Sequence, residues 1–312
     1  GMPRGATHER LIRAYLRVAV GKVCSEVDRR ESERLLRAQP FIAAAVVRVV
    51  PGTPGHTRVN VDVIDEVRLI VAASVSHGTL SSALLGTQSL AGSGLSLVGH
   101  AERGFAYRNG YGLRAVQYGV FGRADFAAVT AQQHAIDGQA VAVEFAEPYL
   151  TDLQSRAFHA SASLRSGYVG LIRPVGADVA LFVRRTFYDV GWVTRIRRAS
   201  GRGTIALAGV ALFGEDVRTG ADLVIVTDTG LAVPPTPTLG VSYPSFASTR
   251  VAAIGGLRAL RFATVHGFDA LTAAQDMGVG VQLDVLLGSS ALTPAHAQDV
   301  FVATDLYAGT GD

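Results

Sequence analysis

The strongest strand signal in the chain is the stretch Val279-Gly-Val-Gln-Leu-Asp-Val-Leu-Leu-Gly288. Large apolar residues alternate here with small or polar ones, and a period of two is the spacing of a β-strand with one apolar and one wet face. The apolar positions are Val279, Val281, Leu283, Val285 and Leu287, and the small or polar ones are Gly280, Gln282, Asp284 and Gly288. The stretch therefore predicts a strand that lies between two different environments.

The same alternation recurs along the chain from about residue 68 onward. Gly, Asn, Asp or Pro residues separate the segments, and helical spacing largely disappears. Parallel strands would need helical crossovers, so about a dozen such segments must be antiparallel neighbours. The expected strands are 67–76, 79–88, 95–102, 111–120, 124–133, 141–146, 158–165, 177–185, 188–196, 203–213, 221–228, 249–263, 279–288 and 298–308.

The polar face of these strands carries ionised groups, among them Glu144, Asp189, Arg195 and Asp284. Closing a long antiparallel meander into a barrel removes its free edges. In a membrane barrel the polar face lines a wet lumen and the apolar face meets lipid, whereas in a soluble sandwich the apolar face meets a second sheet. The number of strands favours a membrane barrel over a soluble sandwich or a lipocalin-like barrel, but the alternation fits all three.

Composition sets further bounds on the class of protein. Hydrophobic residues make up 48% of the 312, yet no apolar run reaches the roughly 18 residues that a transmembrane helix needs. The net charge of +3 is spread along the chain and does not indicate nucleic-acid binding. Cys24 is the single cysteine, so an intramolecular disulfide is excluded. No signal peptide precedes the first helical segment, and we therefore expect the sequence to be a fragment of a longer protein.

The first 66 residues follow a different pattern. Apolar spacing predicts helices at 7–20 and 25–38, and strands at 41–50 and 57–66. Ser25 with Asp28, or Asp28 with Glu31, can cap the second helix. Glu26–Arg30 and Glu33–Arg37 are i,i+4 ion pairs, and we interpret this charge run as a solvated helix face.

Motifs for covalent chemistry are absent from the sequence. The eight histidines show no HExxH or Cys/His pairing, and Gly92-Ser93-Gly94 and Gly278-Val279-Gly280 fit no phosphate loop. No GxSxG elbow precedes a helix. We therefore expect no enzyme activity, no catalytic residue, no cofactor and no metal site. Trp192 and Tyr188 suit an interfacial aromatic girdle or, equally well, ordinary strand positions.

The N-terminal segment resembles a POTRA domain. The resemblance lies in Val20-Gly-Lys-Val-Cys-Ser-Glu-Val-Asp-Arg-Arg-Glu-Ser-Glu-Arg-Leu-Leu-Arg-Ala-Gln-Pro-Phe-Ile42 and the strand that runs from it to Val50. Residues 57–66, with their acidic Asp65-Glu66 exit, resemble the closing strand of such a domain. The usual first strand is missing, which again favours a truncated N-terminus.

The rest of the chain resembles the barrel of the BamA/TamA-like outer-membrane assembly and translocation superfamily, in its "surface antigen" branch. Ser89–Gly94 resembles an early turn, and Asp137-Gly138 with the strand ending in Glu147-Pro148-Tyr149 resembles a family strand. Val265-His266-Gly267-Phe268 resembles the Val-Arg-Gly-Phe motif of a loop folded back into the barrel. Asp305, in the next strand, resembles the inward Asp that pairs with the motif arginine.

One departure from the family motif concerns its charge. His266 stands where the motif has arginine, and a neutral histidine can still hydrogen-bond Asp305 but lacks the permanent charge and the planar fork. The chain also ends near the thirteenth of the family's sixteen strands, which supports a longer natural protein.

The resemblance implies a mainly β fold, in which a POTRA-like periplasmic module (1–66) precedes an incomplete antiparallel transmembrane β-barrel (67–312) with about 12–13 of 16 strands. It implies a protein of the bacterial cell outer membrane that assists insertion or translocation of other outer-membrane polypeptides. Its partners would be outer-membrane lipid, unfolded client proteins, and periplasmic chaperones or lipoproteins, but no nucleic acid. The alternative is a passive porin-like or structural surface-antigen barrel, and a soluble ligand-binding β-protein is a third possibility.

Overall fold

The computed structural model describes residues 6–76, 78–103, 109–134, 138–171, 179–198, 204–227, 229–234, 244–266, 274–291 and 299–310. The first elements are the helices α1 (Glu9–Ala14) and α2 (Glu26–Arg37), followed by the strands β1 (Ile42–Pro51) and β2 (Thr57–Asp65). β1 and β2 pair with each other in an antiparallel two-stranded sheet. The Ser25 hydroxyl accepts a hydrogen bond from the Asp28 N–H, which confirms the first of the two predicted caps of α2.

All remaining strands belong to one antiparallel sheet whose order follows the sequence. The short strand β12 pairs only with the distal part of β11 within the described residues. The strands are β3 (Leu69–Ser76), β4 (Thr79–Thr87), β5 (Leu95–Glu102), β6 (Gly110–Tyr118), β7 (Phe126–His134), β8 (Gly138–Glu147), β9 (Arg156–Leu171), β10 (Val179–Arg198), β11 (Ile205–Thr227), β12 (Gly230–Ala232), β13 (Phe246–His266), β14 (Ala274–Ser290) and β15 (Val300–Gly309), and a short 3₁₀ helix η1 (Leu90–Gly92) lies in the β4–β5 turn.

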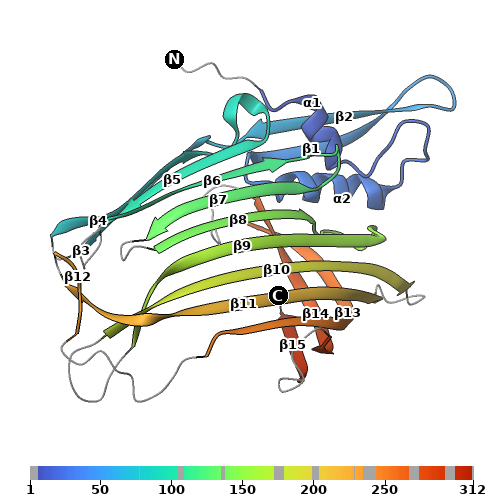
Figure 1. The fold of residues 1–312 in the computed structure, drawn as a ribbon. Helices are drawn as coiled ribbons and strands as arrows, with labels where there is room; N and C mark the ends of the chain where they lie inside the picture. Colours follow the sequence, from blue (N-terminus) through green and yellow to red (C-terminus); the bar gives the residue numbers. More distant parts are fainter. Residues whose placement is uncertain are drawn as a thin grey trace.

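The sheet curls strongly, so that β14 and β15 lie behind the middle strands (Figure 1). It does not close: β3 and β15 are the two ends of the strand order, and they do not pair with each other within the described residues. The predicted antiparallel meander is confirmed, and its form is that of an open, barrel-like sheet. Among the described residues, no helix is long and apolar enough to cross a membrane.

Two pairs of expected segments are single long strands. The described parts of 177–185 and 188–196 belong to one strand, β10, and those of 203–213 and 221–228 belong to one strand, β11. Residues 177, 178, 203 and 228 lie outside the described residues. The expected breaks were placed where the alternation weakens. In β10 the chain continues through that region as a regular ladder with β9, and register shifts between Leu181 and Val183 and between Arg195 and Arg197 occur only against β11.

The two faces of the curled sheet differ as the alternation predicts. Residues directly opposite one another in neighbouring strands point to the same side. The register places Glu144, Ser161 and Asp189 in one cross-strand row on the inside, and Val143, Ala162 and Tyr188 in the adjacent row on the outside. The outer side chains are exposed rather than covered by a second sheet; they include Val129, Val141, Val143, Val190, Val210, Leu212, Val251, Val281 and Leu287, which are 41–58% exposed.

The N-terminal elements sit at one end of the sheet (Figure 1). Their core contains Leu35, Phe41 and Val47, and it also takes in Ala124 from the β6–β7 turn and Leu150 from the β8–β9 turn. The His8 N–H donates to the Gly92 carbonyl of the β4–β5 turn at 3.0 Å. The first 66 residues therefore share a core with the adjacent hairpin turns, and a short link joins β2 to β3.

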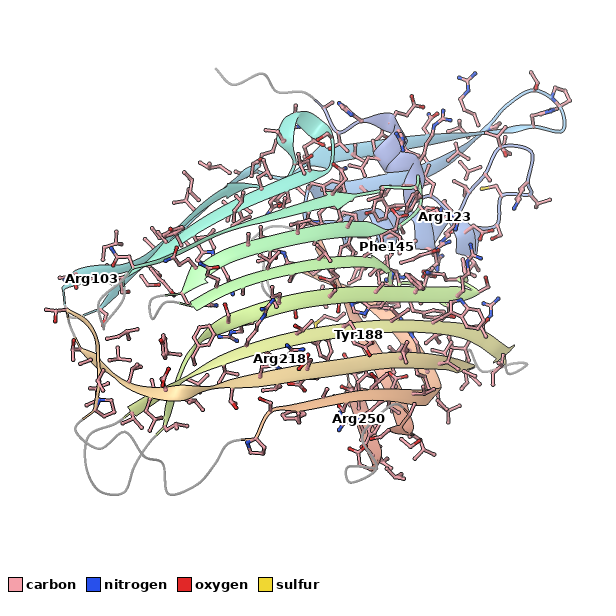
Figure 2. The ribbon with its side chains drawn as sticks, in the orientation of Figure 1. Arg103, Arg123, Phe145, Tyr188, Arg218 and Arg250 are labelled. Atoms are coloured by element: carbon pink, nitrogen blue, oxygen red, sulfur yellow. The ribbon has the colours of Figure 1, made fainter. Side chains whose placement is uncertain are left out.

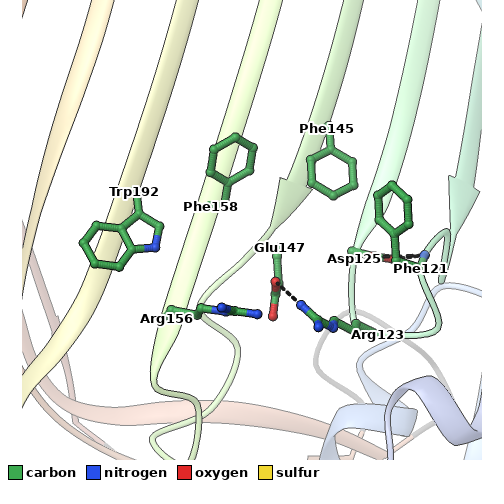
Figure 3. A pocket seen from close by; sticks show the side chains of 8 residues that line it. All are labelled: Phe121, Arg123, Asp125, Phe145, Glu147, Arg156, Phe158 and Trp192. Carbon is green, nitrogen blue, oxygen red and sulfur yellow. Dashed lines mark hydrogen bonds and ion pairs between the residues drawn. The ribbon is translucent and has the colours of Figure 1, made fainter.

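A row of aromatic side chains crosses the outer face near this end (Figure 3). Phe121, Phe145, Phe158 and Trp192 come from four successive segments, and the neighbouring phenyl centroids are 5.5 and 5.9 Å apart. Arg123, Glu147 and Arg156 line the same groove on the side towards the N-terminal elements. Figure 2 shows that Arg103 lies at the opposite end of the sheet from Arg123.

Candidate functional site

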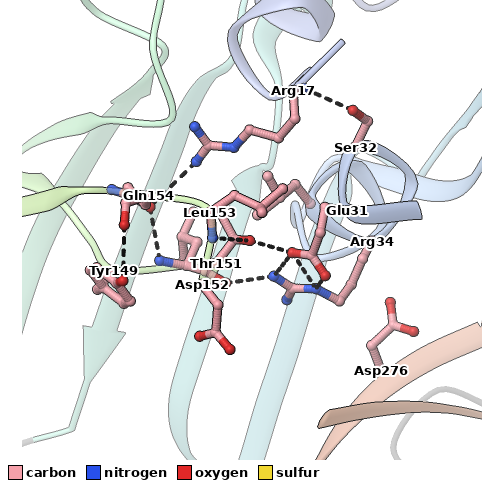
Figure 4. A network of polar contacts seen from close by, with 12 residues as sticks. Arg17, Glu31, Ser32, Arg34, Tyr149, Thr151, Asp152, Leu153, Gln154 and Asp276 are labelled. Atoms are coloured by element: carbon pink, nitrogen blue, oxygen red, sulfur yellow. Dashed lines mark hydrogen bonds and ion pairs between the residues drawn. The ribbon is translucent and has the colours of Figure 1, made fainter. Parts of the chain in front are cut away.

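The candidate site is the polar junction where α2 meets the end of the curled sheet (Figure 4). Arg34 of α2 donates through Nη2 to the Leu150 carbonyl at 2.6 Å, and its guanidinium lies 3.8 Å from the ring centroid of Phe262 on β13. The Arg34 side chain is only 9% exposed. Arg34 thereby connects the β8–β9 turn to β13, which is the third strand after β9 in the order of the sheet.

A second arginine of α2 reaches β14. Arg37 forms an ion pair with Asp276, with Nη2 3.0 Å from Oδ2, and the two side chains are 13% and 7% exposed. Arg37 also contacts Glu33 at 2.7 Å on its own helix, while Thr264 donates to Asp276 at 2.7 Å. A buried ion pair with these additional hydrogen bonds fixes the position of the helix against the sheet.

Glu31 links α2 to the fully buried hydroxyl of Thr151 in the β8–β9 turn. Burial by itself would raise the pKa of the Glu31 carboxyl, but hydrogen bonds from Arg34 and Thr151 outweigh it, and the pKa lies below its ordinary value. Glu31 is therefore ionised at neutral pH and completes a charged bridge between helix and turn.

The β8–β9 turn is itself held across the end of the sheet. Arg258 on β13 donates to the Tyr149 carbonyl at 3.3 Å, and its Nε lies 3.3 Å from Asp152 Oδ1. Gln154, which is 5% exposed, donates to the carbonyls of Pro148 and Arg156 at 2.9 Å. The turn and α2 together cover part of this end.

The inner wall carries a second polar group further from the junction. His159 Nδ1 lies 3.0 Å from Asp189 Oδ2, and His159 Nε2 lies 3.4 Å from Glu144 Oε1. Glu144 in turn lies 4.0 Å from Arg114 on β6. These side chains span β6, β8, β9 and β10 and are 28–55% exposed, so the inside of the sheet offers a charged surface.

Comparisons with known proteins give little sequence support. No protein-family model matches the chain. No curated protein matches it either. Among solved structures, the chain is similar to the crystal structure of BamA from Haemophilus ducreyi lacking POTRA domains 1–3, with 11% sequence identity and a TM-score of 0.39. The alignment covers 97% of this chain and 49% of that one, so the chain spans about half the length of that structure. At this identity and TM-score the similarity assigns no activity.

The structure separates the residues that the resemblance places together. Val265 and His266 form the end of β13, on the side of the sheet where α2 lies, and Gly267 and Phe268 lie outside the described residues. His266 is opposite Ala274, whereas Asp305 on β15 is opposite Asp284. Ten residues of extended β14 separate those two positions, which is about 33 Å. At this separation the hydrogen bond that a neutral histidine could make to Asp305 is not formed in the positions described.

The junction residues themselves were not predicted as a site. The helix that carries Glu31, Arg34 and Arg37 was interpreted as a solvated charged face, which holds for the Glu26–Arg30 pair but not for these three. A usable signal existed: α2 has charged or polar residues around most of its circumference, so some of them had to face protein. Within the described ranges, no group of three His, Cys, Asp or Glu side chains is arranged to hold a metal ion.

Proposed function

We propose that the chain is part of a bacterial outer-membrane β-barrel protein whose outer face contacts lipid and whose N-terminal elements face the periplasm. The single observation that carries this proposal is the exposed apolar outer face combined with the charged inner wall. An exposed apolar surface of this extent is unfavourable in water and favourable in hydrocarbon. Lipid is accordingly the first partner.

We propose further that the N-terminal elements, a POTRA-like module, help other outer-membrane polypeptides to insert. The edges of the β1–β2 sheet support this proposal. On β1, α2 occupies the outward backbone groups of Val47: Glu33 accepts from its N–H at 3.1 Å and Arg29 donates to its carbonyl at 2.8 Å. This edge is therefore already in use.

Within the residues that the structure describes, β2 pairs with β1 alone, so its outer edge is the available one. Val61 is directly opposite Val47, and opposite residues of an antiparallel pair point their backbone groups in matching directions, either both inward or both outward. The N–H and carbonyl of Val61 therefore face away from β1. An extended client segment can pair with such an edge by β-augmentation. The client then folds into the membrane next to the large curled sheet. No covalent step is needed.

A pair of substitutions at this edge tests the proposal. Val61→Pro removes the outward N–H, which the β1–β2 ladder does not use, whereas Val61→Ala keeps that N–H and removes a similar amount of packing. We expect vesicles containing the protein to accelerate the folding of a client barrel over empty vesicles. Val61→Pro will lose most of this acceleration and Val61→Ala will keep it.

The same vesicles separate the proposed activity from the passive alternative. Ion conductance without any acceleration of client folding would support a porin-like or structural barrel. Equal activity of the proline and alanine variants would contradict capture at the β2 edge. Periplasmic chaperones or partner lipoproteins would add to the rate but are not required for this difference.

A further inference from the structure

We propose that the groove on the outer rim binds one phosphatidylethanolamine headgroup, with the phosphate on the guanidinium groups of Arg123 and Arg156 and the ammonium on Glu147, which lies between them. This inference rests on the proposed location in a membrane and adds a specific lipid site to it. The groove has a volume of about 470 Å³.

The wall of the groove combines an apolar platform with a charged border. Phe145, Phe158 and Trp192 lie side by side on β8, β9 and β10, and Phe121 from the β6–β7 turn extends the row (Figure 3). Their rings point outward with the rest of the apolar face. An acyl chain running over this row would bury both surfaces, as aromatic residues at barrel rims do.

The charged border of the groove has two positive side chains and one negative side chain, which can pair with the phosphate and the ammonium of a zwitterionic headgroup. Arg123 and Arg156 extend from opposite sides towards the Glu147 carboxylate (Figure 3). Arg123 Nη1 lies 3.8 Å from Glu147 Oε2, which is a loose ion pair, and the Arg123 side chain is 57% exposed. The carboxylate of Asp125 is not accessible to a headgroup, because Asp125 is buried and accepts a hydrogen bond from the Phe121 N–H at 3.2 Å.

The position of Glu147 between Arg123 and Arg156 distinguishes among common phospholipids. A phosphate accepts charge-assisted hydrogen bonds from guanidinium groups. The primary ammonium of ethanolamine can donate to Glu147, whereas the quaternary ammonium of choline has no N–H to donate. Glu147 repels the phosphate of either lipid, but only ethanolamine brings an ammonium that offsets this repulsion, whereas phosphatidylglycerol brings no cation. The charges therefore favour ethanolamine over choline and glycerol headgroups.

The single tryptophan of the chain makes this site directly observable. Trp192 lines the groove, so its fluorescence is quenched by phospholipids whose acyl chains carry bromine and which bind there. The protein is reconstituted in phosphatidylcholine vesicles and titrated with brominated phosphatidylethanolamine, phosphatidylglycerol or phosphatidylcholine. We expect about tenfold stronger relative binding of the ethanolamine lipid than of the choline lipid, which corresponds to one hydrogen bond to a charged group.

Variants distinguish a built site from general contact with lipid. The double variant Arg123→Gln/Arg156→Gln should remove the preference, and Glu147→Gln should reduce it while improving binding of phosphatidylglycerol. Arg103→Gln changes the same charge at the opposite end of the sheet and should have no effect (Figure 2).

Each outcome has a defined meaning. Equal quenching by the three lipids, or a preference unchanged in the double variant, would overturn the headgroup site and leave the membrane location intact. Strongest binding of phosphatidylglycerol would overturn the role of Glu147. No quenching by any brominated lipid would contradict the proposed membrane location itself.

Discussion

Replacing Arg37 with methionine should destabilise the docking of α2 against the sheet by about 3–5 kcal/mol, because it leaves Asp276 charged and buried without its main partner. The Asp276 side chain is 7% exposed, so water does not compensate for the missing guanidinium. Hydrogen exchange of the α2 amides measures the effect directly, since the free energy of local opening should fall by that amount.

The same helix supplies the control. Arg30 pairs with Glu26 on the exposed side, with side chains 74% and 55% exposed, and Arg30→Met should change the opening free energy by less than about 0.5 kcal/mol. Combining Arg37→Met with Asp276→Leu should restore most of the loss, because both charges are then removed. Equal effects of Arg37→Met and Arg30→Met would show that the junction does not hold the helix.

Phe41→Ala should cost about 3–5 kcal/mol in the free energy of unfolding. Phe41 is 2% exposed and lies in the core that joins the N-terminal elements to the hairpin turns. Its ring centroid is 6.3 Å from that of Tyr15 and 5.5 Å from that of Tyr118 on β6. The substitution therefore leaves a cavity between the N-terminal elements and β6, and it removes the ring contacts with Tyr15 and Tyr118.

Equilibrium unfolding in denaturant measures this loss. Phe246→Ala removes the same atoms from a side chain that is 50% exposed at the start of β13, and it should cost less than about 1 kcal/mol. If Phe41→Ala and Phe246→Ala destabilise equally, the shared core does not join the two parts of the molecule.

Most of the strands could be predicted from the alternation of apolar and polar residues. The segment 279–288 lies within β14, and its apolar residues face outward as predicted, because a period of two leaves no other arrangement for a strand between two environments. The helix–helix–strand–strand start is also confirmed, although α1 is shorter than expected and ends at Ala14. The Ser25 cap of α2 could be predicted from the sequence because Ser25 and Asp28 are only three positions apart.

The long strands exceeded what the pattern could predict. In β10 and β11 the ladder continues through Arg184-Arg185-Thr186 and Glu215-Asp216-Val217, where the alternation weakens. These segments carry charged side chains in successive positions instead of alternating apolar ones, so the period of two is not visible in the sequence. Backbone pairing alone extends the strands there.

The junction could not be predicted, because its partners are remote in sequence. Arg37 and Asp276 are 239 positions apart, and Arg34 and Leu150 are 116 apart. A helix rich in arginine and glutamate satisfies local i,i+4 pairing equally well in water, so the sequence does not reveal which pairs are buried. The motif around His266 rests on resemblance alone, and the strand register places His266 and Asp305 far apart along β14.

The central claim is that the outer face of the sheet touches hydrocarbon while the inner face touches water. Ser161 and Ala162 are adjacent on β9 and point to opposite faces. Ala162 lies four residues, about 13 Å, from the rim at Phe158, which is near the middle of an apolar band about 25 Å tall. Spin labels on single cysteines at these positions, in a Cys24→Ser background, can be tested in vesicles for collision with oxygen and with a water-soluble nickel complex.

We expect oxygen to relax a label at position 162 strongly and the nickel complex barely to reach it, and we expect the reverse at position 161. Labels that are equally accessible to nickel at both positions would place both faces in water and would contradict a lipid-facing outer surface.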